Sequence, residues 1–326
     1  MLKFLFCENR YGFVMDLFRH GGLLRSFLMV AREGNVTAAA EKLGISQPAL
    51  TRSIRRLEDE TGFRLFDRHT RGVTPTIYGK ALLRHAQLID TECRFASSEL
   101  EALRSGHRGQ IKIGGGPFWG AALLPRAVAR LHSLLPKLQV NLQIGVNNVL
   151  HPKLLDGELD LVVSAAPRDL SQFPEHFRFT RITTIRSQMF VREGHPILAQ
   201  ERIRYEDLAN YPWIMYQQDP EIIERVATLL KDLGVNPPRI AIEASSLMAV
   251  LELLRSGDFL ACLAAPILGV VQDVGIRPVP IDREIWSFPA GITYHRAIEQ
   301  STPFELLRQM LTDEVTKLGL DRTEQR

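Results

Sequence analysis

The chain has 326 residues, 45% of them hydrophobic and 24% charged, and a net charge of +3. This length leaves room for a small domain and a larger one with real hydrophobic cores, and the composition excludes a disordered chain. Residues 1–109 contain 17 Lys and Arg against 12 Asp and Glu, whereas residues 110–326 contain 23 against 25, so the excess positive charge lies in the N-terminal part.

Residues 35–62, NVTAAAEKLGISQPALTRSIRRLEDETG, predict two short helices joined by a tight turn. Small residues in the first helix allow close packing against its partner. The segment also supplies the capping and turn residues that such a pair needs, namely Asn35 or Thr37, Gly44, Ser46 and Pro48.

The second helix of the pair has one apolar and one basic face. Leu50, Ile54 and Leu57 form the predicted buried stripe, and arginines occupy the opposite side. An ordinary helical hairpin with a solvated basic face is the alternative, which the caps, the Gly turn and the early Pro make the weaker interpretation. We therefore predict a DNA recognition helix, with contacts from Thr37, Ser46, Gln47, Pro48, Thr51, Arg52, Arg55 and Arg56.

Residues 62–76, GFRLFDRHTRGVTPT, contain two short extended pieces that suit a β-wing, from which Arg68 and Arg71 reach the DNA backbone or minor groove. Together, AAAEKLGISQPALTRSIRRLEDETGFRLFDR and the following RGVTPTIYGKALL resemble the LysR-type transcriptional regulators. The resemblance covers residues 21–106 by strong motif matches and the rest by pattern. It places a winged helix-turn-helix at 21–75 and leaves residues 1–20 as an N-terminal extension.

A long helix is predicted from Thr76 to about Arg104, within a linker at 76–106. A heptad seam runs along it through Leu82, Ala86, Ile89, Cys93, Ala96, Leu100 and Leu103. This narrow seam favours a coiled-coil dimer over a helix packed on its own domain. At about 1.5 Å per residue the helix forms an arm of about 43 Å, which would hold two DNA-binding heads apart on a pseudo-palindromic site in double-stranded DNA.

After residues 106–109, strand and helix patterns alternate. Strands are predicted at 110–114, 138–146, 160–165, 211–216, 239–244 and 259–264, with helices at 122–135, 151–159, 221–233 and 246–256 between them, before a final strand in IWSFPAGITYH and a C-terminal helix. This βαβ order implies parallel strands covered by helices.

We expect an α/β domain at 110–326 made of two subdomains, the first at about 110–187 and 285–326, the second at about 188–284, with hinges near 186–188 and 282–284. The arrangement resembles the periplasmic-binding-protein fold that the LysR family uses as its effector domain.

Ligands of open α/β sheets sit beyond the carboxyl ends of the strands, near helix N-termini. That rule selects as effector-binding residues Gly116, Phe118, Trp119, Asn147 and Asn148 in the first subdomain, and Tyr216, Gln217, Ser245, Ser246 and Met248 in the second. Each has an alternative, because the two aromatic residues suit the core equally well and Asn147, Ser245 and Ser246 suit helix caps. Aromatic rings beside amides fit either a planar aromatic metabolite or a sugar.

The chain departs from the LysR pattern in the first strand-to-helix turn, where the family often has a hydroxyl residue and this sequence has Gly114-Gly115-Gly116-Pro117. Backbone amides remain there, but the side-chain donor is lost, which weakens the case for a carboxylate pocket. The resemblance implies that an effector alters closure of the two subdomains and, through a tetramer, the spacing of the DNA heads. RNA polymerase is a further candidate partner of such a regulator.

Other classes of protein lack support in the sequence. The nine histidines show no H-x-x-H spacing, G-x-S-x-G is missing, and GGGPFWG is not followed by the Lys-Ser/Thr of a phosphate loop, so no catalytic set and no cofactor are expected. An enzyme fused to a DNA head is the remaining alternative to a regulator. The three cysteines, Cys7, Cys93 and Cys262, suggest neither a disulfide framework nor a zinc site. A solute-binding transport protein would need a signal peptide, and no membrane span is evident, so we expect a cytoplasmic, nucleoid-associated protein.

Overall fold

The computed structural model describes residues 21–70, 72–105, 109–121, 123–170, 173–216, 239–267, 275–281 and 285–320, with the single residues 224, 227, 228, 231 and 269. The chain folds as two compact units, Met1–Arg94 and Phe95–Arg326, each of which is described by itself. The predicted N-terminal extension and most of the helix predicted at 221–233 lie outside the described residues.

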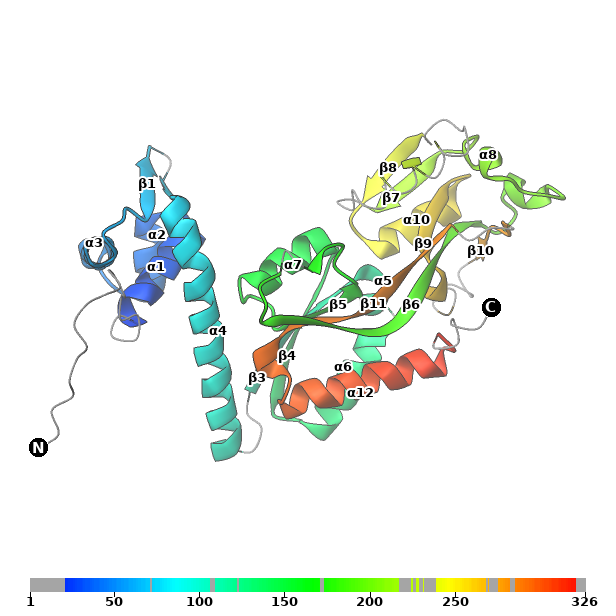
Figure 1. Cartoon of the computed structure of the whole chain (residues 1–326). Coiled ribbons are helices and arrows are strands. Elements are labelled where there is room, and N and C mark those ends of the chain that lie inside the picture. Colours follow the sequence, from blue (N-terminus) through cyan, green and yellow to red (C-terminus); the bar gives the residue numbers. More distant parts are fainter. Residues whose placement is uncertain are drawn as a thin grey trace, which may run out of the picture. The chain divides into compact units, whose positions relative to one another are not determined.

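The described part of the N-terminal unit begins with the helices α1 (Gly21–Glu33), α2 (Val36–Leu43) and α3 (Gln47–Thr61) and continues with a two-stranded hairpin, β1 (Phe66–His69) and β2 (Gly72–Pro75) (Figure 1). Asn35 begins α2, since its Oδ1 accepts hydrogen bonds from the backbone N–H of Thr37 at 2.8 Å and of Ala38 at 3.2 Å. Gly44 ends the helix in the left-handed region at φ 66°, and the Ser46 side chain caps α3. The antiparallel pairing of β1 with β2 confirms the predicted wing.

The long helix α4 (Ile77–Ser105) begins within the N-terminal unit. Its first turns pack on that unit, because Leu82, Leu83 and Ala86 contact the core around Phe27, Leu50, Ile54, Leu57 and Val73. The sequence prediction that the whole seam serves a coiled coil was therefore wrong for Leu82 and Ala86. These two residues pack the helix against its own domain.

Further along α4 the seam residues are open to solvent in the single chain. Ile89 is 37% exposed and Leu100 67% exposed, and Cys93 and Ala96 are also exposed, while the Leu103 side chain lies outside the described part. Apolar residues on a solvent-facing helix are unfavourable unless a partner covers them. This half of α4 therefore fits the predicted dimer contact.

The C-terminal unit is built on one mixed sheet with the strand order β4-β3-β5-β11-β6-β9-β7-β8, and β10 pairs with β6. Its strands are β3 (Gly109–Gly115), β4 (Leu138–Ile144), β5 (Leu161–Ala165), β6 (Phe177–Arg192), β7 (Trp213–Tyr216), β8 (Ile240–Ala244), β9 (Leu260–Ala264), β10 (Ile276–Pro278) and β11 (Trp286–His295). Parallel pairing was predicted, and it holds for β3 with β4 and β5 and for β7 with β8 and β9.

The prediction of parallel strands was wrong for the centre of the sheet. There β6 and β11 pair antiparallel with each other over the full length of β11. Strand β11 also pairs antiparallel with β5, and β6 with β9. These two strands run from one half of the unit into the other (Figure 1). The predicted hinge at 186–188 lies within β6, and the one at 282–284 lies outside the described residues.

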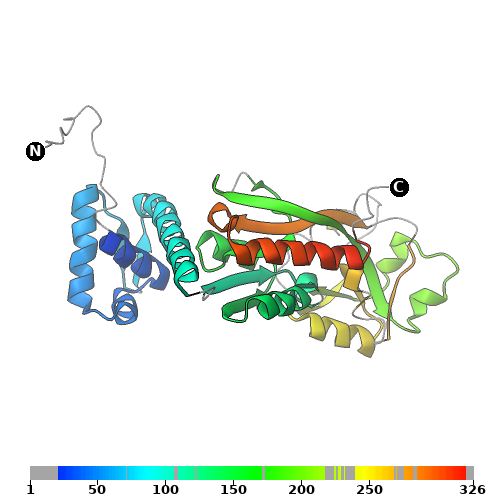
Figure 2. The same ribbon diagram turned by 90° about the horizontal axis from the view of Figure 1, so that it is seen from below.

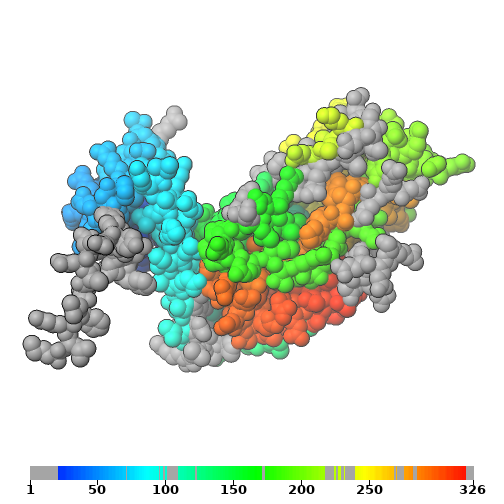
Figure 3. Space-filling view, viewed as in Figure 1, coloured from blue at the N-terminus to red at the C-terminus, as the bar shows by residue number. Residues whose placement is uncertain are grey.

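Helices cover both faces of the first half. The helices α6 (Leu123–Leu134) and α12 (Thr302–Lys317) lie side by side (Figure 2), and α12 forms part of the outer surface (Figure 3). Leu161 and Val163 of β5 face the core that these helices share, whereas Val162 faces the core under α7 (Asn147–Leu155). Alternate residues of a strand point to opposite faces, which explains why this short strand is apolar throughout.

In the second half, α10 (Leu247–Ser256) packs through Val250, Leu251 and Leu254 against Ile214 and Ala261. The opposite face of the same strands, with Met215, Leu260 and Cys262, packs against the segment of η3 (Pro196–Ala199) and α8 (Tyr205–Leu208). Three further short helices are α5 (Pro117–Ala121), η4 (Ala265–Ile267) and η6 (Arg296–Ile298).

Candidate functional site

The N-terminal end of α3 presents a polar surface to solvent. Gln47, Pro48 and Arg52 are exposed, and Thr51 is half-buried. Leu50, Ile54 and Leu57 lie on the other side of the helix and are buried in the core of the unit. The apolar stripe thus fixes which side chains α3 offers to a partner, as the sequence predicted.

The arginines of α3 differ in whether their side chains form an ion pair. Arg56 donates from Nε to Glu60 Oε1 at 2.9 Å, which is an ion pair one helical turn apart. Arg52 and Arg55 are exposed and make no ion pair within the described part of the chain. Two guanidinium groups are therefore available for phosphates or base edges without first breaking a contact.

The wing is fixed to the helices by short backbone contacts. The N–H of Val73 donates to the Gly34 carbonyl at 2.8 Å, and a Cβ at Gly72 would lie 2.2 Å from that same oxygen. Gly72 also has a φ of 139°, so glycine is required at this position. Arg68 is exposed on β1, and Arg71 lies outside the described residues.

Of the other predicted DNA contacts, Thr37 and Ser46 are exposed at the first turn of α2 and the cap of α3. The Ser46 hydroxyl accepts the Ala49 N–H at 3.4 Å, and the Thr37 backbone N–H is held by Asn35. The side chains of Thr37, Gln47 and Arg52 therefore come from the turn and helix starts on one end of the helix pair, where a helix-turn-helix meets a groove.

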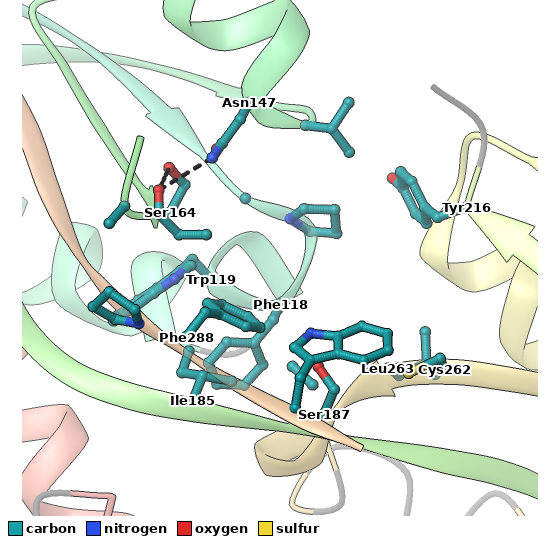
Figure 4. A pocket seen from close by; sticks show the side chains of 18 of the residues that line it. Phe118, Trp119, Asn147, Ser164, Ile185, Ser187, Tyr216, Cys262, Leu263 and Phe288 are labelled. Atoms are coloured by element: carbon teal, nitrogen blue, oxygen red, sulfur yellow. Dashed lines mark hydrogen bonds between the residues drawn. The ribbon is translucent and has the colours of Figure 1, made fainter. Parts of the chain in front are cut away.

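The C-terminal unit contains a cavity of about 340 Å³ between its two halves. Its walls come from the turn after β3, the start of α7, the end of β5, the middle of β6, and β7, α10, β9 and β11 (Figure 4). The aromatic side chains that line it are Phe118, Trp119, Tyr216, Trp286 and Phe288. Because both halves contribute, occupation of the cavity would affect how the halves close.

The structure brings half of the predicted effector residues to this cavity. Gly116, Phe118, Trp119, Asn147 and Tyr216 line it. Phe118 and Trp119 are both buried, so they belong to the core as well as to the cavity wall. The sequence had left open whether they pack in the core or face the ligand, and their position fits both.

The remaining predicted effector residues lie elsewhere. Asn148 and Met248 are exposed and do not line the cavity, and Met248 is 74% exposed. The Ser246 side chain accepts the Ala249 N–H as the cap of α10, and the Ser245 carbonyl accepts the Tyr216 hydroxyl at 2.7 Å. Gln217 lies outside the described residues.

Most polar side chains at the cavity already have protein partners. Asn147 Nδ2 and Ser164 Oγ both donate to the Ala165 carbonyl, each at 3.1 Å (Figure 4). Arg168 Nη1 pairs with Glu224 Oε2 at 3.1 Å, and both of these side chains are largely exposed. Ser187 is one exception, because it is 5% exposed, lines the cavity and makes no hydrogen bond through its hydroxyl with any described residue. The indole N–H groups of Trp119 and Trp286, which also line the cavity, likewise make no hydrogen bond with a described residue.

The amides predicted to remain in the first turn are less available than expected. The Gly116 N–H donates to the Val163 carbonyl at 2.9 Å, and Pro117 has no N–H. The Gly116 N–H is therefore not a free backbone donor in this turn.

Two titratable side chains at the cavity stay neutral near pH 7. Burial raises the pKa of the Cys262 thiol, so it remains protonated and behaves as a small apolar side chain. Burial likewise raises the pKa of the Tyr216 hydroxyl. Among the described residues no group of three or more His, Cys, Asp or Glu is placed to hold a metal ion.

Sequence reasoning missed the walls that β6 and β11 supply. Ile185 and Ser187 lie in the middle of β6, and Trp286 and Phe288 lie at the amino end of β11. The rule used for parallel sheets selects carboxyl ends, so it does not select them. Ser164 follows that rule, as the second-last residue of β5, and was overlooked. Within the described residues, no helix has the length and apolar character needed to cross a bilayer.

Comparison with known proteins agrees with this architecture. The family described as "LysR substrate binding domain" matches residues 104–316, and "Bacterial regulatory helix-turn-helix protein, lysR family" matches residues 22–80. The "SDS degradation transcriptional activation protein" of a Pseudomonas species is 37% identical over 259 residues, covering 77% of this chain and 80% of that protein. The regulator PcaQ of Agrobacterium fabrum is 32% identical over 312 residues, covering 94% of this chain and 97% of that protein.

Solved structures share the fold. A full-length OxyR variant from Pseudomonas aeruginosa superposes with a TM-score of 0.66 at 21% identity, covering 94% of this chain and 98% of that one. CbnR, a LysR family transcriptional regulator, gives a TM-score of 0.58 at 21% identity, covering 92% and 99%. CbnR has also been solved in complex with its target DNA, with a TM-score of 0.57 at 20% identity, covering 91% and 99%. Family and relatives consist of transcriptional regulators and not of enzymes, and the chain belongs to the LysR family of DNA-binding transcriptional regulators.

Proposed function

We propose that a small-molecule effector binds in the cavity between the two halves of the C-terminal unit and thereby changes how the protein holds DNA. The observation that carries this proposal is the cavity itself, because residues of both halves line it. A ligand that contacts both walls has different affinities for the more closed and the less closed arrangement of the two halves. Only such a difference in affinity can shift the equilibrium between the two arrangements.

On the DNA side, we propose that Gln47, Thr51 and Arg52 read base edges, while Arg55, Arg56 and Arg68 contact phosphates. Exposure of these side chains at the start and along one face of α3 and on β1 supports the assignment, with Thr51 half-buried. Arg71, Thr37, Ser46 and Pro48 complete the proposed interface. The domains are then a winged helix-turn-helix at 21–75, a linker helix at 76–106 and an effector-binding domain at 110–326.

Self-association links the two functions in this proposal. Ile89 and Leu100 lie exposed on the outer half of α4, which supports a dimer through that helix, and a tetramer is inferred from the family resemblance alone. A dimer with paired heads suits a pseudo-palindromic site in double-stranded DNA, with RNA polymerase as a further candidate partner. Because the target is chromosomal DNA, we place its action at the nucleoid.

A footprinting experiment with a blocked cavity tests this proposal. Ala264 lines the cavity on β9, and the large side chain of Ala264→Trp would fill part of it. Small-molecule fractions from the source cells are added to protein bound at a mapped site. The proposal expects one fraction to alter the wild-type footprint and to leave the Ala264→Trp footprint unchanged. An identical response of both proteins would contradict it.

A further inference from the structure

The chemistry of the cavity wall narrows the kind of molecule that it accepts. Apart from Arg168, the described lining residues carry no charged side chain, and no carboxylate is among them. A cationic ligand would therefore find no counter-ion. Sugars need several hydrogen-bonding partners, and Asn147, Ser164 and Tyr216 each already donate one proton to a backbone carbonyl, which leaves the two hydroxyls as acceptors only.

These contacts leave three polar groups of the described wall without a protein partner, the Ser187 hydroxyl and the indole N–H groups of Trp119 and Trp286. Of these, the Ser187 hydroxyl alone can both donate and accept a hydrogen bond. It lies on β6, opposite Ala264 of β9 and Trp286 of β11 in the sheet register, and its neighbours along the wall are Ile185, Leu263 and Phe288 (Figure 4). Because this hydroxyl faces the cavity without a protein partner, a ligand group that bonds to it gains affinity.

The group that meets Ser187 must be uncharged. Arg168, the sole cation on the described wall, is half-exposed and paired with Glu224, so it marks the rim and not the depth of the cavity. An ionised carboxylate or sulfate beside Ser187 would lose its water without gaining a counter-charge. Gly116 and Pro117 offer such a group no backbone donor, because the Gly116 N–H already donates to the Val163 carbonyl and Pro117 has no N–H.

We propose that the effector is a largely apolar molecule with one neutral hydrogen-bonding group, a hydroxyl or carbonyl, and that Ser187 is the residue that recognises this group. This inference rests on the proposed function of the cavity and specifies its ligand class. The aromatic body packs against Phe118, Trp286 and Phe288. A cavity of about 340 Å³ lies at the small end of the range of about 300–1,000 Å³ found for ligand pockets, which suits a body of one or two rings.

Isothermal titration calorimetry of the full chain with four probes tests the proposal. The probes are 2-naphthol, naphthalene, 2-naphthoate and glucose, which share or vary the ring body and the polar group. For the wild type, 2-naphthol is expected to bind about threefold to tenfold more tightly than naphthalene, as one hydrogen bond predicts, and more tightly than 2-naphthoate or glucose.

Two nearly isosteric variants separate recognition from packing. Ser187→Ala should bring the affinities for 2-naphthol and naphthalene to within about twofold, since it removes only the bond that distinguishes them. Its melting temperature should not fall, because the hydroxyl has no protein partner to lose. Ser164→Ala is the matched control, because its hydroxyl is bonded to Ala165, and it should keep the wild-type preference.

The outcomes distinguish the ligand class from the function of the cavity. If 2-naphthoate or glucose binds best and Ala264→Trp abolishes that binding, the cavity binds ligands and the inferred class is wrong. If Ala264→Trp binds 2-naphthol as the wild type does, the cavity is not the site, and the proposed function fails with it. No measurable binding of 2-naphthol to the wild type, or an equal loss for 2-naphthol and naphthalene in Ser187→Ala, also overturns the inference.

Discussion

Replacing Gly79 in the first turn of α4 with alanine should destabilise the protein, whereas the same replacement of an ordinary helical glycine stabilises it. Alanine in place of glycine inside a helix usually stabilises it by about 1 kcal/mol. At Gly79, however, a Cβ would lie 2.1 Å from the Leu65 carbonyl oxygen and 3.2 Å from the Pro75 Cβ. The glycine thus lets the linker helix lie directly against the segment that leads into the wing.

The size of the effect follows from the contact that must be relieved. The backbone of α4 and the Leu65 carbonyl would have to separate by about 1 Å, and such overpacking costs about 1–3 kcal/mol. The movement also strains the Thr76 N–H to Leu65 carbonyl bond of 3.0 Å, a bond of a type that contributes about 0.5–1.5 kcal/mol. After the helix gain is subtracted, Gly79→Ala should destabilise the N-terminal unit by about 1–3 kcal/mol.

Gly22 in α1 is the matched control, because a Cβ there meets nothing within 4 Å. Gly22→Ala should raise the stability by about 0.5–1 kcal/mol. Calorimetry of the full chain, with the transition of the N-terminal unit followed separately, should show the melting temperature lowered by several degrees for Gly79→Ala and raised for Gly22→Ala. Stabilisation of both variants would refute the close approach of α4 to Leu65.

Three further predictions concern a buried carboxylate, a buried histidine and the recognition helix. Glu314 is 5% exposed and accepts from Lys317 Nζ at 2.7 Å and Arg130 Nη1 at 3.3 Å, contacts that lower its pKa, so Glu314→Gln should cost about 1–3 kcal/mol at pH 7. This stabilisation is lost as the pH falls through the lowered pKa of Glu314, so the free energies of unfolding of the wild type and Glu314→Gln, measured with urea, should converge below pH 4.5. A difference between the two that does not change with pH would contradict the ion pairs. Burial lowers the pKa of His195, whose Nδ1 accepts the Ile197 N–H at 3.1 Å. The wild type should therefore lose stability as the pH falls below 6.5, and His195→Asn, which keeps a hydrogen-bond acceptor, should lose less. An equal fall in the free energy of unfolding with pH for both proteins would count against a neutral His195. Arg52→Ala should weaken binding to the specific site by about 1–3 kcal/mol with little effect on random DNA, and an equal loss on both in gel-shift titrations would make Arg52 a phosphate contact.

The sequence predicted best the parts of the fold that local chemistry determines. In the N-terminal unit, Asn35, Gly44, Ser46 and the stripe through Leu50 act within a few residues of themselves, and the helices begin and end where these residues are. The strand β6 was missed, because charged residues such as Arg178, Arg181 and Arg186 interrupt its apolar pattern. Its stability comes from pairing with β11, more than ninety residues later in the chain, which no local pattern reports.

The candidate site was predicted in part for the same reason. Residues at the carboxyl ends of parallel strands, such as Gly116, Asn147 and Tyr216, were found by a rule that depends on strand direction, and they line the cavity. The same rule selected Ser246 and Met248, although the first caps α10 and the second points to solvent. Ser187 could not be found, since only the pairing of β6 with β9 and β11 places it on the wall.

Genome-wide footprinting with the purified protein tests the central claim most directly, because a regulator must find particular sites among many. A LysR-type regulator with the recognition helix described above should protect a few sharp, pseudo-palindromic sites, and the neighbouring genes would then indicate which apolar compounds to try in the cavity. Diffuse binding that disappears with added salt would contradict the account, since α3 would then provide only electrostatic attraction to DNA.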